Sequence, residues 1–198
     1  MSHNFSSPDR RSLLLSAAGI LMTSTATNAA SAQAAPTAPA PALLPVTGTA
    51  ARGDFDFLTG EWRIKIRKFD TSGPNGHQVR DASATVHRVL NGMGSIEELR
   101  NGDGSMWGMG VRVLHPNDNQ WADHWTSAQD GVVNPPQLGT FIDGAGIFFA
   151  DDRDGDTPIK IRAVWDQITP TSCRWYQTMS RNGGESYERD WYMNWTRV

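Results

Sequence analysis

The residues of this sequence best suited to move a proton are two histidines, His87 and His124. The side-chain pKa of histidine lies near neutrality, which suits this residue to general acid or base work. His124 follows Asp123 within the alternating run 120–127, and successive residues of a regular strand point to opposite faces. Only one of these two neighbours can therefore face an interior cavity. For each histidine, a solvent-facing or hydrogen-bonded structural role is the alternative.

Arg112 is the candidate for holding a developing negative charge. It shares a strand face with Gly108 and Gly110, which leave room above the sheet. Its guanidinium could therefore reach inward and bind a carboxylate or enolate through two parallel hydrogen bonds. A surface position is the alternative for this arginine. If the chain is an enzyme, the expected catalytic residues are His124, His87, Asp123 and Arg112.

Tryptophan is unusually frequent in this chain, which has eight between Trp62 and Trp195. Each is a large amphipathic side chain, and a domain of this size has little interior volume to fill with them. We therefore expect some of them to line a cavity, together with a few polar side chains that orient a ligand. The alternative is that each one simply fills the core. The expected ligand-binding residues are Trp107, Arg112, His124, Trp125, Trp165 and Gln177.

The sequence shows no metal-binding motif. The histidines from His77 to His124 form neither an HxH nor an HxxxH pattern, and the single cysteine, Cys173, provides no thiolate cluster and no internal disulfide. The run 151–156 resembles part of a calcium loop but lacks its closing glutamate, so we interpret it as a solvated acidic turn. We expect no metal and no cofactor.

The charge distribution argues against a nucleic-acid partner. The formal net charge is -3, and the lysines and arginines are scattered among carboxylates. A polyanion-binding protein is expected to carry a basic stripe with interleaved aromatic residues, and no such stripe is present.

The elements that must position these side chains are strands. Residues 61–69 place Trp62, Ile64 and Ile66 on one face and basic residues on the other, which is the period-two pattern of a half-buried strand. Turn clusters rich in Gly, Asn and Asp separate further extended runs. The expected strands are 61–69, 78–90, 95–100, 107–114, 120–127, 139–142, 146–149, 159–166, 174–180 and 188–197.

No segment of helical length shows a 3.6-residue period, and only residues 54–59 suit a short helical turn. About ten short strands without crossover helices should close on themselves, because closure removes exposed strand edges. We therefore predict an all-β domain over residues 53–198, built as a single antiparallel β-barrel of about 8–10 strands with a short N-terminal helical turn.

The first 34 residues have the order of a twin-arginine export signal. Arg10 and Arg11 precede the apolar stretch 13–22, which is too short to span a bilayer permanently as a helix, and small residues follow. Ala32-Gln33-Ala34 offers a cleavage site that leaves Ala35 as the new N-terminus, and cleavage after Ala32 is the alternative. The twin-arginine export machinery is therefore an expected partner.

Residues 35–52 are rich in Ala, Pro and Thr and show no apolar periodicity, so we predict a disordered linker between the signal and the barrel. The expected product is a periplasmic or secreted domain that is not an integral membrane protein.

Gly60-x-Trp62, at the start of the first expected strand, is similar to the entry motif of lipocalins and other calycins. Arg197 lies near the end of the last strand, where calycins commonly stack an arginine across that tryptophan. The resemblance implies a calycin-like barrel that Gly60, Trp62 and Arg197 close at one end.

A closer likeness covers about residues 55–198. Arg174-Trp175-Tyr176-Gln177, the turn 180–185 and the tail 188–197 resemble the closing motifs of the DUF1579-type bacterial family, whose members are lipocalin-like and of unknown function. Nitrobindin-like haem binders, another calycin group, ligate iron through a histidine near the C-terminus. This chain has no histidine after His124, which disfavours haem.

Two functions fit these observations. The first is a binding protein that holds a hydrophobic or amphipathic small molecule between aromatic walls. The second is a cofactor-independent lyase, isomerase, cyclase or hydrolase on the same barrel, with His124 or His87 moving a proton and Arg112 holding the anion. One barrel architecture hosts both uses, so the side chains facing the interior must distinguish them.

Overall fold

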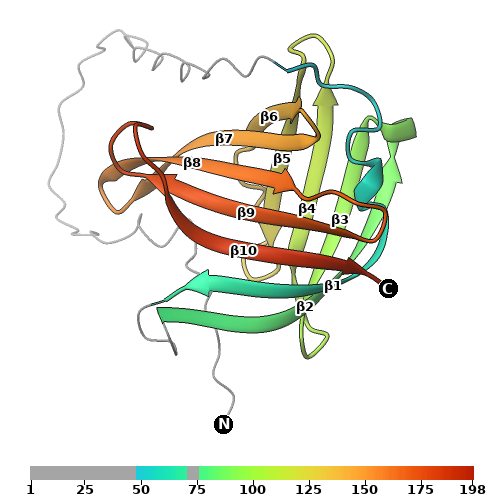
Figure 1. Cartoon of the computed structure of the whole chain (residues 1–198), viewed down its shortest axis with the longest axis horizontal. Helices are drawn as coiled ribbons and strands as arrows, with labels where there is room; N and C mark the ends of the chain where they lie inside the picture. The colour runs from blue at the N-terminus through green and yellow to red at the C-terminus, as the bar shows by residue number, and fades with distance from the viewer. Residues whose placement is uncertain (1–47, 71–75) are drawn as a thin grey trace, which may run out of the picture.

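The computed structural model describes residues 48–70 and 76–198, and over these residues the chain forms ten antiparallel strands in a closed barrel (Figure 1). This confirms the predicted fold class. The strands are β1 (Gly60–Phe69), β2 (His77–Val89), β3 (Gly94–Asn101), β4 (Met106–His115), β5 (Gln120–Ser127), β6 (Gln137–Ile142), β7 (Ala145–Asp154), β8 (Thr157–Asp166), β9 (Ser172–Ser180) and β10 (Glu188–Arg197). No helix in the described ranges has the length and apolar character needed to cross a membrane.

Each strand pairs with its neighbour in sequence, and β1 pairs with β10 to close the sheet. Alternation in β1 sets the inside of the barrel, because Trp62, Ile64 and Ile66 are buried while Arg63 and Lys65 are exposed. The inner face of each strand therefore forms the core, and polar side chains cover the outside.

The shortest strand pairing in the barrel wall is between β5 and β6, where only three residue pairs of the described chain are in register. The second half of β5 continues without β6, and the loop 128–136 lies beside it. A bridge between Thr126 and Val133 and a 2.9 Å hydrogen bond from the Asn134 amide to the Trp125 carbonyl hold this loop against the strand. The loop therefore forms part of the wall at this position.

One end of the barrel is closed by the short 3-10 helix η1 (Asp56–Leu58) and by Arg197. The Arg197 guanidinium lies 4.3 Å from the centre of the Trp62 ring and donates hydrogen bonds to the carbonyls of Thr59 (2.6 Å) and Phe57 (2.7 Å). Gly60 has a φ of +122°, and a Cβ there would lie 2.8 Å from the Arg197 guanidinium, so the close approach needs glycine. The closing contacts implied by the calycin resemblance are thus the geometry found here.

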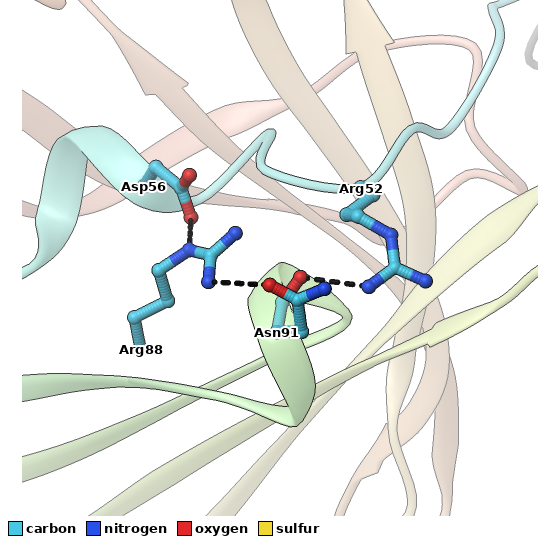
Figure 2. Close-up of polar contacts among 4 residues, drawn as sticks. All are labelled: Arg52, Asp56, Arg88 and Asn91. Atoms are coloured by element: carbon cyan, nitrogen blue, oxygen red, sulfur yellow. Dashed lines mark hydrogen bonds and ion pairs between the residues drawn. The ribbon is translucent and has the colours of Figure 1, made fainter.

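The segment that leads into β1 is fastened to the corner between β2 and β3 (Figure 2). Arg88 donates to the Asp56 carboxylate at 2.8 Å and to the Asn91 side chain at 3.3 Å, while Arg52 donates to the Asn91 carbonyl at 2.8 Å. Asn119 exchanges hydrogen bonds with the backbone of residues 48–50. The described end of the predicted linker, from residue 48 on, therefore contacts the barrel, and the earlier linker residues and the predicted signal lie outside the described chain.

The hairpin of β7 and β8 is longer than the sequence indicated. We expected a strand to end at Phe149 and the acidic run 151–156 to form a turn, but β7 continues to Asp154. Lys160 pairs with Asp151 at 2.7 Å and Arg181 pairs with Asp154 at 2.6 Å. A cross-strand lysine and the arginine that follows β9 thus offset the repulsion between neighbouring carboxylates and allow the strand to continue.

Candidate functional site

The interior of the barrel contains a cavity lined by residues of β3, β4 and β5 and of β8, β9 and β10. The cavity has a volume of about 120 Å³. The loop 128–136 contributes Gln129, Asp130 and Asn134 to the wall. All eight tryptophans lie in the described chain, and the six that line the cavity are Trp107, Trp125, Trp165, Trp175, Trp191 and Trp195.

Four of these tryptophans form a connected aromatic wall. Trp107 stacks on Trp191 with ring centres 5.7 Å apart, and Trp125 meets Trp107 edge to face at 5.9 Å. Trp175 meets Trp191 edge to face at 5.4 Å. Such pairs gain about 0.5–1.5 kcal/mol beyond the area they bury, so the wall is held in a defined arrangement.

Two glycines on β4 make room for this arrangement. A Cβ at Gly108 would lie 2.4 Å from the Trp125 ring, so that ring rests directly on the strand backbone. A Cβ at Gly110 would lie 3.2 Å from the Arg112 guanidinium and 3.4 Å from Glu97. The glycines therefore provide the space above the sheet that the sequence suggested, and it is filled by Trp125 and by a buried ion pair.

Three charged side chains meet on the wall formed by β3, β4 and β5. Arg112 donates to the Glu97 carboxylate at 2.6 Å, and its Nε lies 3.4 Å from the Asp123 carboxylate. The Arg112 and Glu97 side chains are only 5% and 4% exposed, and that of Asp123 is 14% exposed. If both carboxylates are ionised the group has a net charge of -1, so Arg112 already has the anionic partners it can neutralise.

Burial in this cluster shifts the affinity of its members for protons. Loss of solvation raises the pKa of Glu97, and the opposing effect of Arg112 does not cancel it. For Arg112, burial alone would lower the pKa, but the charges of Asp123 and Glu97 outweigh it and raise the pKa. Burial, with a smaller effect of Glu97, also raises the pKa of the Cys173 thiol to about 12. Glu97 is therefore a cavity carboxyl group that holds its proton more readily than a solvent-exposed glutamate does.

The indole N–H groups divide the tryptophans into two sets. At the closed end, Trp62 donates to the Leu58 carbonyl at 2.7 Å and Trp121 donates to Asp54 at 3.0 Å. Within the described residues, three indoles of the cavity wall have a buried N–H without a hydrogen-bond partner. These are Trp165, Trp191 and Trp195. A buried donor without a partner destabilises the folded protein, so acceptor atoms of a bound molecule could form favourable hydrogen bonds with these indoles.

The structure brings most of the residues expected at the site into one place. Asp123, Arg112, Trp107, Trp125 and Trp165 line the cavity. His124 also contributes to the lining, but it lies on the opposite face of β5 from Asp123, and its Nδ1 is 3.0 Å from the Asn134 carbonyl oxygen in the loop. Asp123 is thus the inward member of the pair.

Two expected residues lie elsewhere. His87 is exposed on the outer face of β2, in alternation with the buried Ala84 and Val86. Gln177 is buried on the inner face of β9 but does not line the cavity. The geometry therefore provides no route by which His87 reaches a ligand inside the barrel.

Sequence reasoning missed Glu97 and Arg80. Both are charged residues on the inner, largely apolar face of a strand. Glu97 shares this face with Leu99, and Arg80 shares it with Ala82. A charge on an otherwise apolar face was the available signal, because buried charges are rare unless they are paired or functional.

No group of three or more His, Cys, Asp or Glu side chains in the described part of the chain could hold a metal ion. In the acidic hairpin 151–156, the carboxylates of Asp151 and Asp154 are paired with Lys160 and Arg181.

Comparison with known proteins adds a likeness in structure. No protein-family model matches the chain, and no curated protein matches it. Among solved structures, an S-type phycobiliprotein lyase from Guillardia theta is similar over 73% of this chain and 90% of that chain, with 11% sequence identity and a TM-score of 0.48. A likeness at this level carries no inference about ligand or activity, so the function must be argued from the cavity.

Proposed function

We propose that this chain is an exported binding protein that holds a hydrophobic or amphipathic small molecule in its tryptophan-lined cavity. The observation that carries the proposal is the convergence of six tryptophans, from β4, β5, β8, β9 and β10, on one cavity in the described chain. A concave aromatic site with a few placed polar groups is the usual form of a small-molecule site.

The indole N–H groups support this reading over simple core filling. The tryptophans that close the barrel have bonded N–H groups, as structural tryptophans normally do. Those of Trp165, Trp191 and Trp195 are buried and unpaired. A ligand with carbonyl or other acceptor atoms could satisfy them after small movements of the indoles, and an apolar body would fill the space between the rings.

The export signal and the kinship with the DUF1579-type family are part of this proposal. Arg10 and Arg11, the apolar stretch and the small residues that follow support export by the twin-arginine route. Passengers of that route are generally exported folded, so the barrel could acquire its ligand in the cytoplasm and carry it to the periplasm.

The test is a titration with N-phenyl-1-naphthylamine, a neutral apolar fluorophore, monitored by its own emission and by quenching of tryptophan fluorescence. We expect saturable binding with micromolar affinity. Ser127→Trp adds bulk at the end of β5 in the cavity lining, and we expect it to weaken binding about tenfold or more. Ser83→Trp places the same bulk on the outer face of β2 and should leave binding unchanged. Equal affinity in both variants would place the bound dye outside the cavity and refute the proposal.

A second function, acid–base catalysis on a bound substrate, is favoured by one observation: Glu97 is buried, has a raised pKa and contacts Arg112 inside the cavity. A carboxyl group of raised pKa can act as a general acid or base near neutral pH. The sequence had assigned this role to His124 or His87, and the geometry favours Glu97. Glu97→Gln keeps the shape but cannot exchange a proton. If catalysis occurs, the molecule that co-purifies with this variant should be the unconverted substrate, which differs from the wild type's product in mass or, for an isomerisation, in chromatographic retention and fragmentation.

A further inference from the structure

Arg80 contacts a tryptophan of the cavity wall but has no role in the binding function proposed above. It lies on the inner face of β2, opposite Ile66 of β1 and beyond the last residue pair between β2 and β3. This position is at the open end of the barrel, away from η1 and Arg197. Its guanidinium lies 3.7 Å from the centre of the Trp107 ring, and Trp107 lines the cavity.

Within the described residues, this contact with Trp107 is the interaction that Arg80 makes: it has no carboxylate partner and donates no hydrogen bond. The contrast with other arginines is clear. Arg112 has Glu97 and Asp123, and Arg174 has both oxygens of Asp166. Arg80 is also half-buried, and this burial lowers its pKa, although a guanidinium remains charged at neutral pH. Its N–H donors therefore have no acceptor among the described residues.

A second cation lies beside it. Lys68 is on the inner face of β1, two residues along from Ile66, and its ammonium nitrogen lies 5.1 Å from the centre of the Trp191 ring. Trp107 and Trp191 stack on each other. Two cations thus sit on two stacked indoles that both belong to the cavity wall.

The charges along the cavity differ in sign. Arg80 and Lys68 lie against two lining indoles at the open end, where the carboxylate of Asp130 also lines the cavity, whereas Glu97, Arg112 and Asp123 further in sum to -1 when both carboxylates are ionised. A negatively charged group is attracted at the open end and repelled further in. An apolar body gains most from the aromatic interior. These opposite preferences select a molecule with an anionic end and an apolar remainder, and they fix its direction.

We propose that Arg80, stacked on Trp107 and assisted by Lys68, binds the anionic group of the ligand, so that the ligand class is an organic anion with a flat apolar body. This inference rests on the proposed binding function and adds the ligand's charge and orientation to it. Arg80 supplies forked hydrogen bonds to a carboxylate or sulfonate, and the ligand body continues along the stacked indoles.

The test compares two dyes with the same aromatic body. 1-Anilinonaphthalene-8-sulfonate carries a sulfonate that N-phenyl-1-naphthylamine lacks. We expect the wild-type mature protein to bind the sulfonate about tenfold more tightly at low salt, and this preference should shrink as ionic strength rises because salt screens exposed charges. A wild-type preference for the neutral dye, or one that salt leaves unchanged, would overturn the inference without the use of any variant.

The variants locate the anion. Arg80→Gln should remove the preference for the sulfonate and leave binding of the neutral dye within about twofold. Arg63→Gln removes the same charge from the exposed outer face of β1 and should preserve the preference. An equal loss in both variants would show general electrostatic attraction and overturn the role of Arg80. If neither dye binds the wild type, the proposed binding function itself fails, which is a different outcome from equal binding of both dyes.

Discussion

Replacing Arg112 by methionine is the substitution for which the structure makes the largest energetic prediction. Arg112 is nearly fully buried between Glu97 and Asp123, with N–O distances of 2.6 and 3.4 Å. Methionine fills much of the same volume but leaves two carboxylates in the cavity wall without their cation. Removing one partner of a buried ion pair costs about 3–5 kcal/mol, and we expect the free energy of unfolding at pH 7 to fall by about that amount.

The loss should depend on pH in a defined direction. The pKa of Glu97 is already above its ordinary value of 4.5 because of burial, and without Arg112 the interactions that oppose this rise disappear. Below pH 4.5 the carboxyl is protonated in both the folded and unfolded chain. Above it, the unfolded chain releases the proton first. The variant should therefore lose stability as the pH rises through the raised pKa, by up to about 1.4 kcal/mol per pH unit, and recover it on mild acidification.

The assay is chemical denaturation, followed by tryptophan fluorescence, between pH 5 and pH 8. Arg181→Met is the matched control, because Arg181 makes an equally short 2.6 Å contact with Asp154 while both side chains are about half exposed. That variant should lose no more than about 1 kcal/mol at any pH in the range. A cost below about 1 kcal/mol for Arg112→Met, without pH dependence, would refute the reasoning that the cluster is desolvated.

Four further results are expected. Arg197→Ala removes a cation–π contact and its hydrogen bonds to backbone carbonyls at the closed end, so thermal denaturation should show a loss of roughly 2–4 kcal/mol, and an unchanged midpoint would contradict the closing role. Glu97→Gln cannot titrate, so its stability should fall less than that of the wild type as pH rises above 4.5; parallel denaturation profiles would show that Glu97 has an ordinary pKa. Cys173, with a pKa of about 12, should react with iodoacetamide at pH 8 only after unfolding, and mass spectrometry that finds rapid alkylation of the folded protein would contradict its burial. Replacing Arg10 and Arg11 by lysines should retain the protein in the cytoplasm, as fractionation would show, whereas normal export would argue against the twin-arginine route.

The barrel could be predicted from sequence because its strands show strong local patterns. The alternation around Trp62 and the Gly, Asn and Asp turns located all ten strands of the described chain, mostly to within one or two residues. The length of the β7–β8 hairpin was underestimated, because the carboxylates of Asp151 and Asp154 favoured a solvated turn. Of the cations that permit the strand, Lys160 lies across the same hairpin, and Arg181 comes from the turn that follows β9. Pairing over such distances has no local signature.

The site was predicted only in part, because some of its residues show a local pattern and others meet only through strand pairing. Gly108 and Gly110 on its face made an inward Arg112 one of two open positions, the other being the surface, and the tryptophan count indicated a cavity. The direction of β5 could not be decided locally, because both faces of 120–127 contain a tryptophan or a titratable residue. Pairing with β4 decides it by placing Asp123 beside Arg112. Glu97 becomes visible as a partner only when β3 is known to lie next to β4.

The central claim is that this barrel carries an amphipathic organic anion among its cavity tryptophans. Native mass spectrometry of the mature protein, purified gently from the periplasm of its own cells, tests it most directly. We predict a complex whose extra mass dissociates as a single small molecule and ionises as an anion. Detection of the bare polypeptide alone, in a preparation that also fails to bind either naphthalene dye, would contradict the account.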